Sequence, residues 1–123
     1  MKSDRLNQMF GQQHDFIKLL EEKRGHPAAP LDLTDKKNQQ FLKHLSHECM
    51  NELFESIAHL KNTKIHRATS LPDFNREEYK EELSDVLHYL IGIMIYSGID
   101  YEEIFEMYMK KGDINVKRIE TGY

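Results

Sequence analysis

The apolar residues of this chain recur with the spacing of α-helices, and sustained alternation of the kind that strands show is nearly absent. This pattern predicts four helices, over residues of roughly 4–23, 35–61 and 76–97 and from Asp100 to a closing Gly112. The tail that follows, "DINVKRIETGY", has no helical stripe. We expect an all-α, four-helix, bundle-like architecture, because a bundle is the simplest way to bury four apolar stripes.

Capping patterns support three of these helix starts. Thr34 is a plausible N-cap for the second helix. Asn75 is followed by Glu78 after three positions, and Asp100 is followed by Glu103 at the same spacing, as in a capping box.

The third helix has little polar surface, because apolar residues occupy more than one of its sides. These residues are Leu87, Leu90, Ile91, Ile93, Met94 and Ile95. A helix that is apolar all round in so small a chain predicts a partner subunit, and we expect a homodimer or a dimer of dimers.

Composition narrows the function classes. A chain of 123 residues is expected to form a single domain, 1–123, and its one cysteine, Cys49, excludes an internal disulfide and a cysteine-based zinc site. The net charge of −4 argues against a nucleic acid polymer or an anionic membrane as partner. The longest apolar stretch, 86–96, is shorter than the roughly 20 residues that span a bilayer. No signal-peptide pattern opens the chain, so a cytoplasmic location is expected.

Two acidic trios with matched spacing mark the second and third helices. They are Glu48, Glu52 and Glu55, and Glu78, Glu82 and Asp85. Each trio covers only about 60° of its helix, so its like charges repel one another. Mg²⁺ takes oxygen ligands and suits such a cluster. On spacing alone, a metal site and a solvated acidic face are equally open readings.

The C-terminal residues resemble a known family. The sequence "KGDINVKRIETGY" contains Lys111, Asn115, Arg118, Gly122 and Tyr123, and the acidic pair Glu82 and Asp85 with His88 lies upstream. Together they resemble the dimeric dUTPases, which belong to the all-α nucleoside triphosphate pyrophosphatases together with the MazG-like enzymes. The resemblance covers roughly residues 41–123.

The resemblance implies hydrolysis of a nucleoside triphosphate, dUTP above all, to the monophosphate and pyrophosphate with Mg²⁺ as cofactor. It implies metal-binding roles for Glu82 and Asp85 and for two of the second-helix glutamates. It assigns phosphate binding to Lys64, Lys111, Asn115 and Arg118. For the base that orients the attacking water, a glutamate of the second helix, Glu52 or Glu48, is the candidate.

The chain also departs from the family pattern. The second-helix motif is read either as Glu48 with Glu52 or as Glu52 with Glu55, and the chain has no tryptophan where the family often has one, near Thr63. These departures concern base selectivity more than hydrolysis. Candidates for base binding are Gln13, His88 and Tyr123.

Each of these three candidates has a simpler alternative. Gln13 would be a helix-surface amide, His88 a buried, hydrogen-bonded histidine behind the metal site, and Tyr123 a packing residue. Other functions also remain open. They are a broader MazG-like (d)NTP pyrophosphatase and a non-catalytic helical interaction module. A di-iron site would need two Glu-x-x-His motifs, and only Asp85 with His88 comes close to one.

Overall fold

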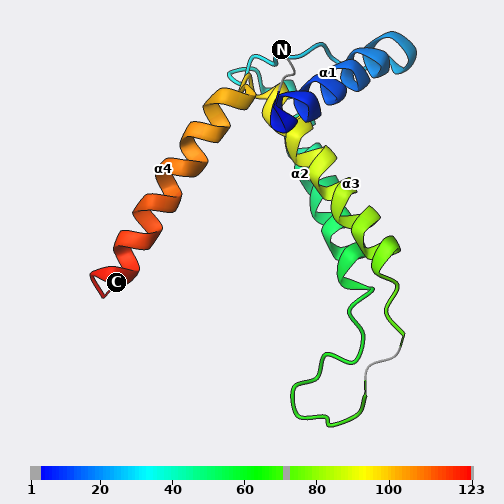
Figure 1. Ribbon diagram of the computed structural model, residues 1–123. Coiled ribbons are helices and arrows are strands. Elements are labelled where there is room, and N and C mark those ends of the chain that lie inside the picture. The colour runs from blue at the N-terminus through cyan, green and yellow to red at the C-terminus, as the bar shows by residue number, and fades with distance from the viewer. Residues whose placement is uncertain (1–3, 71–72, 123) are drawn as a thin grey trace. The chain divides into compact units, whose positions relative to one another are not determined.

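The computed structural model describes residues 4–70 and 73–122, and these residues form four α-helices and no strand (Figure 1). The helices are α1 (Arg5–Arg24), α2 (Lys36–Ile57), α3 (Arg76–Tyr96) and α4 (Tyr101–Glu120). The predicted all-α, four-helix fold class is confirmed. No helix among the described residues is long and apolar enough to cross a membrane.

The chain divides into two compact units. The first consists of residues 1–31 and 94–123, and the second of residues 32–93. The single domain expected from chain length stays a prediction.

The first unit has its core along one stripe of α1. Phe10, Gln13 and Ile17 are buried there, at the alternating three- and four-residue spacing that keeps side chains on one helix face. The ring of Phe10 lies 6.5 Å from that of Tyr101, at the start of α4. In the same unit, the backbone N–H of Leu31 donates to the carbonyl of Tyr96 at 2.7 Å. These contacts connect α1 with the first turn of α4, and the loop after α1 with the last residue of α3.

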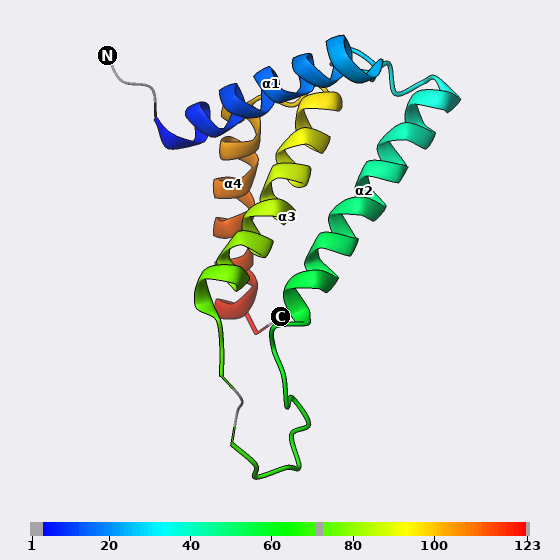
Figure 2. The ribbon, with the colours of Figure 1, turned by 90° about the vertical axis from the view of Figure 1, so that its right-hand side faces the viewer.

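The second unit is a hairpin of α2 and α3, which run side by side and are joined by a long loop (Figures 1 and 2). Among the positions shielded from solvent, both helices contain a series that repeats every seven residues, as in coiled-coil seams. We call this series the seam; on α2 and the turn after it the seam consists of Leu42, Leu45, Cys49, Glu52, Ser56 and His59, and on α3 of Tyr79, Glu82, Val86, Tyr89 and Ile93. The thiol of Cys49 donates to the carbonyl of Val86 at 3.6 Å and connects the two helices.

The burial along α2 differs from what apolar spacing predicts. The spacing of the apolar residues Leu45, Cys49, Leu53, Ile57 and Leu60 predicts that they share a buried stripe. That prediction is wrong for Leu53, Ile57 and Leu60, which are all more than 40% exposed, while Ser56 is only 1% exposed. The reason is that the polar positions in the C-terminal half of α2 face α3. The face that carries Leu53, Ile57 and Leu60 is therefore left outside the hairpin. The shielded face of this half is therefore polar.

Two of the predicted helix starts are confirmed by their hydrogen bonds. Asp100 accepts from the backbone N–H of Glu103 at 2.8 Å, and the Glu103 carboxylate accepts in return from the backbone of Asp100. Asn75 accepts from the backbone N–H of Glu78 at 3.1 Å. Both side chains satisfy amides that the first helical turn leaves without partners.

The predicted cap of α2 is wrong by one residue. Asp35 is the N-cap and accepts from the backbone N–H of Lys37 at 2.8 Å. The hydroxyl of Thr34 instead donates to the carboxylate of Asp32 at 2.7 Å. Thr34 therefore belongs to a turn before the helix. The end of α2 also differs, since the helix stops at Ile57 and not near residue 61.

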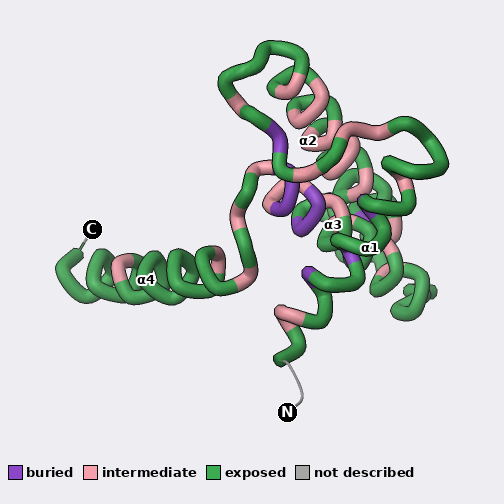
Figure 3. The backbone as a smooth tube through the Cα atoms, turned by 90° about the horizontal axis from the view of Figure 1, so that it is seen from above, coloured by how far each residue is buried: buried purple, intermediate pink, exposed green. Residues whose placement is uncertain are grey.

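The prediction that Gly112 closes the last helix is wrong, because α4 continues to Glu120. Glycine weakens a helix interior by about 1 kcal/mol but does not terminate it unless its backbone turns to positive φ. Among the described glycines, Gly25, Gly98 and Gly122 have positive φ and Gly112 does not. The residues expected to form an irregular tail are helical, and α4 has no buried residue (Figure 3).

Candidate metal centre

Three carboxylates of the hairpin come together. Glu52 from α2 and Glu82 and Asp85 from α3 each offer one oxygen, and these atoms all lie within 4.8 Å of one another. Glu52 and Glu82 occupy seam positions and are half-buried, whereas Asp85 lies at the exposed rim. The cluster forms because the C-terminal part of α2 packs along the seam against the N-terminal turns of α3.

The electrostatics of the cluster oppose full ionisation. Burial raises the pKa of Glu52, and the hydrogen bond and charge of Glu55 and the charges of Asp85 and Glu82 raise it further. Burial also raises the pKa of Glu82, with Glu55 and Asp85 adding to the effect and His59 lowering it. Glu55 therefore acts on both half-buried glutamates. Carboxylates from the acidic faces of both helices therefore lie in one cluster.

The geometry suits a divalent cation. Oxygen atoms that bind one octahedral ion at about 2.1 Å lie about 3.0 Å apart when adjacent and about 4.2 Å apart when opposite. The oxygens of the cluster lie within 4.8 Å of one another, so small side-chain rotations would bring them to these distances. A cation would also offset the repulsion that raises the pKa values of Glu52 and Glu82.

Glu48 is half-buried on α2 but is not a seam residue. It is not among the three grouped carboxylates, and its charge acts instead on Tyr89, whose pKa is raised by burial first and then by Glu48, Glu52 and Asp85. Of the two readings of the second-helix motif, the arrangement favours Glu52 with Glu55. Glu78 is exposed in the first turn of α3, and its backbone N–H donates to the side chain of Asn75, which caps the helix.

His59 is a neighbour of the cluster to which sequence analysis gave no role. Its Nε2 atom lies 4.0 Å from Oε1 of Glu82, and both side chains are about one quarter exposed. The signal for it was spacing, because His59 follows Glu52 by seven residues and therefore lies on the same helical face. The helix ends at Ile57, but the turn after it preserves this placement.

The base-binding candidates have mixed outcomes. His88 is exposed, so the alternative of a buried histidine behind the metal site is wrong; its position on α3 faces away from the seam. Gln13 is only 8% exposed, so it is not a surface amide. Tyr123 lies outside the described residues. Base binding by all three stays a prediction.

The phosphate-binding candidates lie on two elements. Lys64 is exposed in the loop between α2 and α3. Lys111, Asn115 and Arg118 are all exposed and share one face of α4, because they are four and three residues apart. The continuous helix thus arranges Lys111, expected at a helix end, in one row with Asn115 and Arg118, which were expected on an irregular tail.

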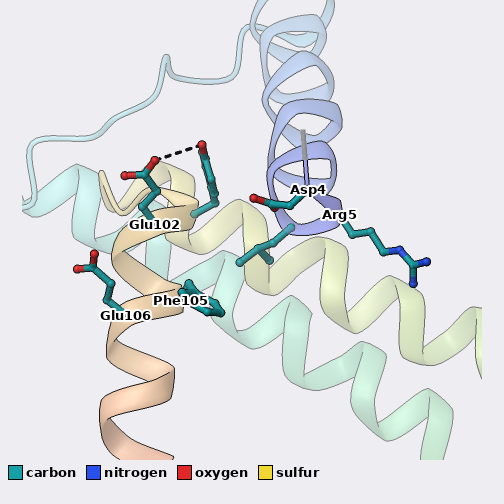
Figure 4. A pocket seen from close by; sticks show the side chains of 7 residues that line it. Asp4, Arg5, Glu102, Phe105 and Glu106 are labelled. Carbon is teal, nitrogen blue, oxygen red and sulfur yellow. Dashed lines mark hydrogen bonds between the residues drawn. The ribbon is translucent and has the colours of Figure 1, made fainter. Parts of the chain in front are cut away.

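A pocket in the first unit has the wrong charge for a triphosphate. It lies between the start of α1 and the first turns of α4, and Asp4, Glu102 and Glu106 bring three carboxylates to it against the single cation of Arg5 (Figure 4). Phosphate groups would be repelled there. The pocket is therefore not a candidate for the nucleotide's phosphate chain.

An all-α fold with carboxylates converging from two neighbouring helices is the arrangement expected of the all-α nucleoside triphosphate pyrophosphatases. A family model described as dUTPase matches residues 31–123, which is more than half of the chain. The chain belongs to this dUTPase family, and at that level it is a dUTPase-like nucleotide pyrophosphatase. Neither the curated proteins nor the solved structures contain a match.

Proposed function

We propose that the protein is a Mg²⁺-dependent pyrophosphohydrolase that converts dUTP to dUMP and pyrophosphate. The observation that supports this most is the group formed by Glu52, Glu82 and Asp85 in a chain of the dUTPase family. Phosphoryl chemistry of this kind depends on positioning and charge neutralisation more than on covalent catalysis, and carboxylates that hold a divalent ion provide both.

In this proposal Glu52, Glu55, Glu82 and Asp85 hold Mg²⁺, with Glu48 as the alternative to Glu55 on α2. When bound, the ion neutralises charge on the triphosphate and fixes its orientation. Glu82 and Asp85 are one turn apart on α3, so the helix itself sets the separation of their carboxylates.

Glu52 is the proposed base that orients the attacking water, and Glu48 is the alternative. Half-burial and neighbouring like charges raise the pKa of Glu52, which brings it closer to neutral pH than an exposed glutamate. A base works best when its pKa lies near the working pH. Glu52 lies on the seam, where its carboxylate oxygen is within 4.8 Å of those of Glu82 and Asp85.

The positively charged candidates would bind the phosphate chain. Lys64, Lys111 and Arg118 offer positive charge, and Asn115 offers an amide that donates or accepts without adding charge. Gln13, His88 and Tyr123 are proposed to contact the base. An amide such as that of Gln13 both donates and accepts, as reading of a uracil edge requires.

A homodimer, or a dimer of dimers, is part of the proposal. The hairpin leaves Leu83, Leu87 and Leu90 of α3 about 40% exposed, beside the exposed leucine side of α2. Apolar surface of this extent is commonly covered in the working protein. Light scattering on the purified chain tests this point. We further propose a single domain over 1–123, a cytoplasmic location, and neither a nucleic acid polymer nor a membrane as partner.

The experiment is pyrophosphate release from dUTP, dCTP, dTTP, UTP and dATP, with Mg²⁺ and with EDTA. Mg²⁺-dependent release with strong preference for dUTP would support the proposal. Equal rates across the panel would favour the broader MazG-like activity, an alternative suggested by the lack of tryptophan in the chain. No release from any of the five would favour the non-catalytic helical module.

A further inference from the structure

His59 and Glu82 lie at ion-pair distance but form no hydrogen bond. The distance of 4.0 Å from Nε2 of His59 to Oε1 of Glu82 is too long for a hydrogen bond. It is close to the distance of about 4.2 Å that separates two opposite donor atoms of one octahedral ion. The two atoms therefore have a separation that two ligands of one ion can have.

The imidazole ring of His59 is held in place by its surroundings. Its backbone N–H donates to the carbonyl of Ser56 at 3.1 Å, which fixes the turn after α2. The ring lies edge-on to Tyr79, with centroids 6.3 Å apart, and Tyr79 in turn packs against Phe74 at 5.3 Å. These contacts reduce the entropy that the side chain would lose on binding an ion.

An imidazole changes which ions a carboxylate site prefers. Mg²⁺ is a hard ion that binds oxygen and keeps several waters, so it gains little from a nitrogen ligand. Imidazole suits zinc and the other later first-row metals, and affinity for a given site rises from Mn²⁺ toward Cu²⁺. A histidine at the edge of a carboxylate cluster thus raises the affinity for transition-metal ions more than the affinity for Mg²⁺.

We propose that His59 is a nitrogen ligand for transition-metal ions at this centre, so that Mn²⁺ and Zn²⁺ bind Glu82 and His59 together while Mg²⁺ binds the carboxylates alone. This inference rests on the proposed metal-binding role of the cluster. It adds a residue outside the acidic motifs, and it makes the choice of ion depend on a side chain from the end of α2.

Electron spin-echo spectroscopy of the full chain loaded with Mn²⁺ alone tests the proposal without an activity assay. A directly bound imidazole gives ¹⁴N modulation of the Mn²⁺ echo, and labelling the histidines with ¹⁵N must change its frequency. We expect the modulation in the wild-type chain and in His47→Gln, the matched control, because His47 is exposed on α2. We expect its loss in His59→Gln.

Titration with Mn²⁺, Zn²⁺ and Mg²⁺ gives the second readout. His59→Gln should weaken Mn²⁺ and Zn²⁺ binding by about tenfold or more, in line with the 10–100-fold effects of residues around metal sites, and change Mg²⁺ binding by less than about twofold. Circular dichroism checks that the variant folds. If it does not fold, absence of ¹⁴N modulation in the wild-type chain would still overturn the proposal, and modulation that persists in both His47→Gln and His88→Gln would still support it.

The outcomes separate this inference from the proposed function. Mn²⁺ binding without ¹⁴N modulation would overturn the role of His59 and leave the carboxylate site intact. Modulation that persists in His59→Gln and disappears in His88→Gln would assign the nitrogen to α3 and also overturn it. Equal weakening of Mg²⁺ and Mn²⁺ would mean that His59 only positions Glu82. Failure to bind any of the three ions would instead overturn the proposed function.

Discussion

Glu52 of α2 and Glu82 of α3 face each other across the hairpin, with carboxylate oxygens within 4.8 Å. Both side chains are half-buried, and both have raised pKa values because burial and like charges disfavour their ionised forms. Without a cation, this pair opposes the packing of the two helices. A bound divalent ion would turn the same pair into a link between them.

Glu82→Gln and Asp85→Asn should each lower the rate of pyrophosphate release by at least about 100-fold, since loss of a metal ligand costs no less than loss of the groups around it. The fold should be retained, because both side chains are polar and the substitutions keep their volume. Kinetics and circular dichroism measure the two effects. Glu81→Gln is the control, because Glu81 is an exposed neighbour on the same helix. Wild-type activity in both variants would contradict the metal assignment.

The stability of the metal-free protein should fall as the pH rises. The pKa values of Glu52 and Glu82 are raised above their ordinary value of 4.5, so the folded state binds more protons than the unfolded chain between that value and the raised ones. Stability then decreases through this window, and the penalty is absent below about pH 4.5 and complete above the raised pKa values.

Thermal unfolding in EDTA measures this effect, with Glu82→Gln for comparison. The variant should have the higher Tm near pH 8, and the difference should vanish toward pH 4.5. Added Mg²⁺ should raise the Tm of the wild-type chain and not that of the variant. A constant Tm difference across the pH range would show that the cluster does not titrate as described.

Ser56→Leu should destabilise the hairpin by about 1–3 kcal/mol, because extra volume in a packed seam forces neighbouring side chains out of position. Ser56 is 1% exposed, and its hydroxyl donates within its own helix to the carbonyl of Leu53 at 2.6 Å. Urea unfolding provides the measurement. Ser84→Leu, at an exposed site on α3, should change stability by less than about 0.5 kcal/mol. Equal effects at the two serines would contradict the seam.

Gly112→Ala should stabilise α4 by about 0.5–1 kcal/mol and increase helicity, because alanine loses less backbone entropy than glycine in a helix. A Cβ atom at this position would meet no atom within 4 Å. Gly98→Ala should do the opposite, since Gly98 has a φ of +75°. Circular dichroism with thermal unfolding distinguishes the two. Loss of helicity in Gly112→Ala would support the shorter helix expected from sequence.

The sequence was sufficient to predict that the four helices exist, because apolar spacing and caps are local properties. Asp100 with Glu103 set the start of α4 from four consecutive residues, and the acidic trios were visible from spacing on single helices. The C-terminal residues from Lys111 onward, together with Glu82, Asp85 and His88, indicated the family, which the match over residues 31–123 confirms.

Tertiary structure decided which faces meet. Local spacing could not show that Ser56 is buried while Leu53 and Ile57 are exposed, because burial depends on the helix that packs opposite. The packing of α2 against α3 grouped Glu52 with Glu82 and Asp85, and it brought His59 beside Glu82. These contacts join residues more than 20 positions apart in the chain. The physical reason is that helix formation follows from neighbours in sequence, whereas a site shared by two helices follows from their packing.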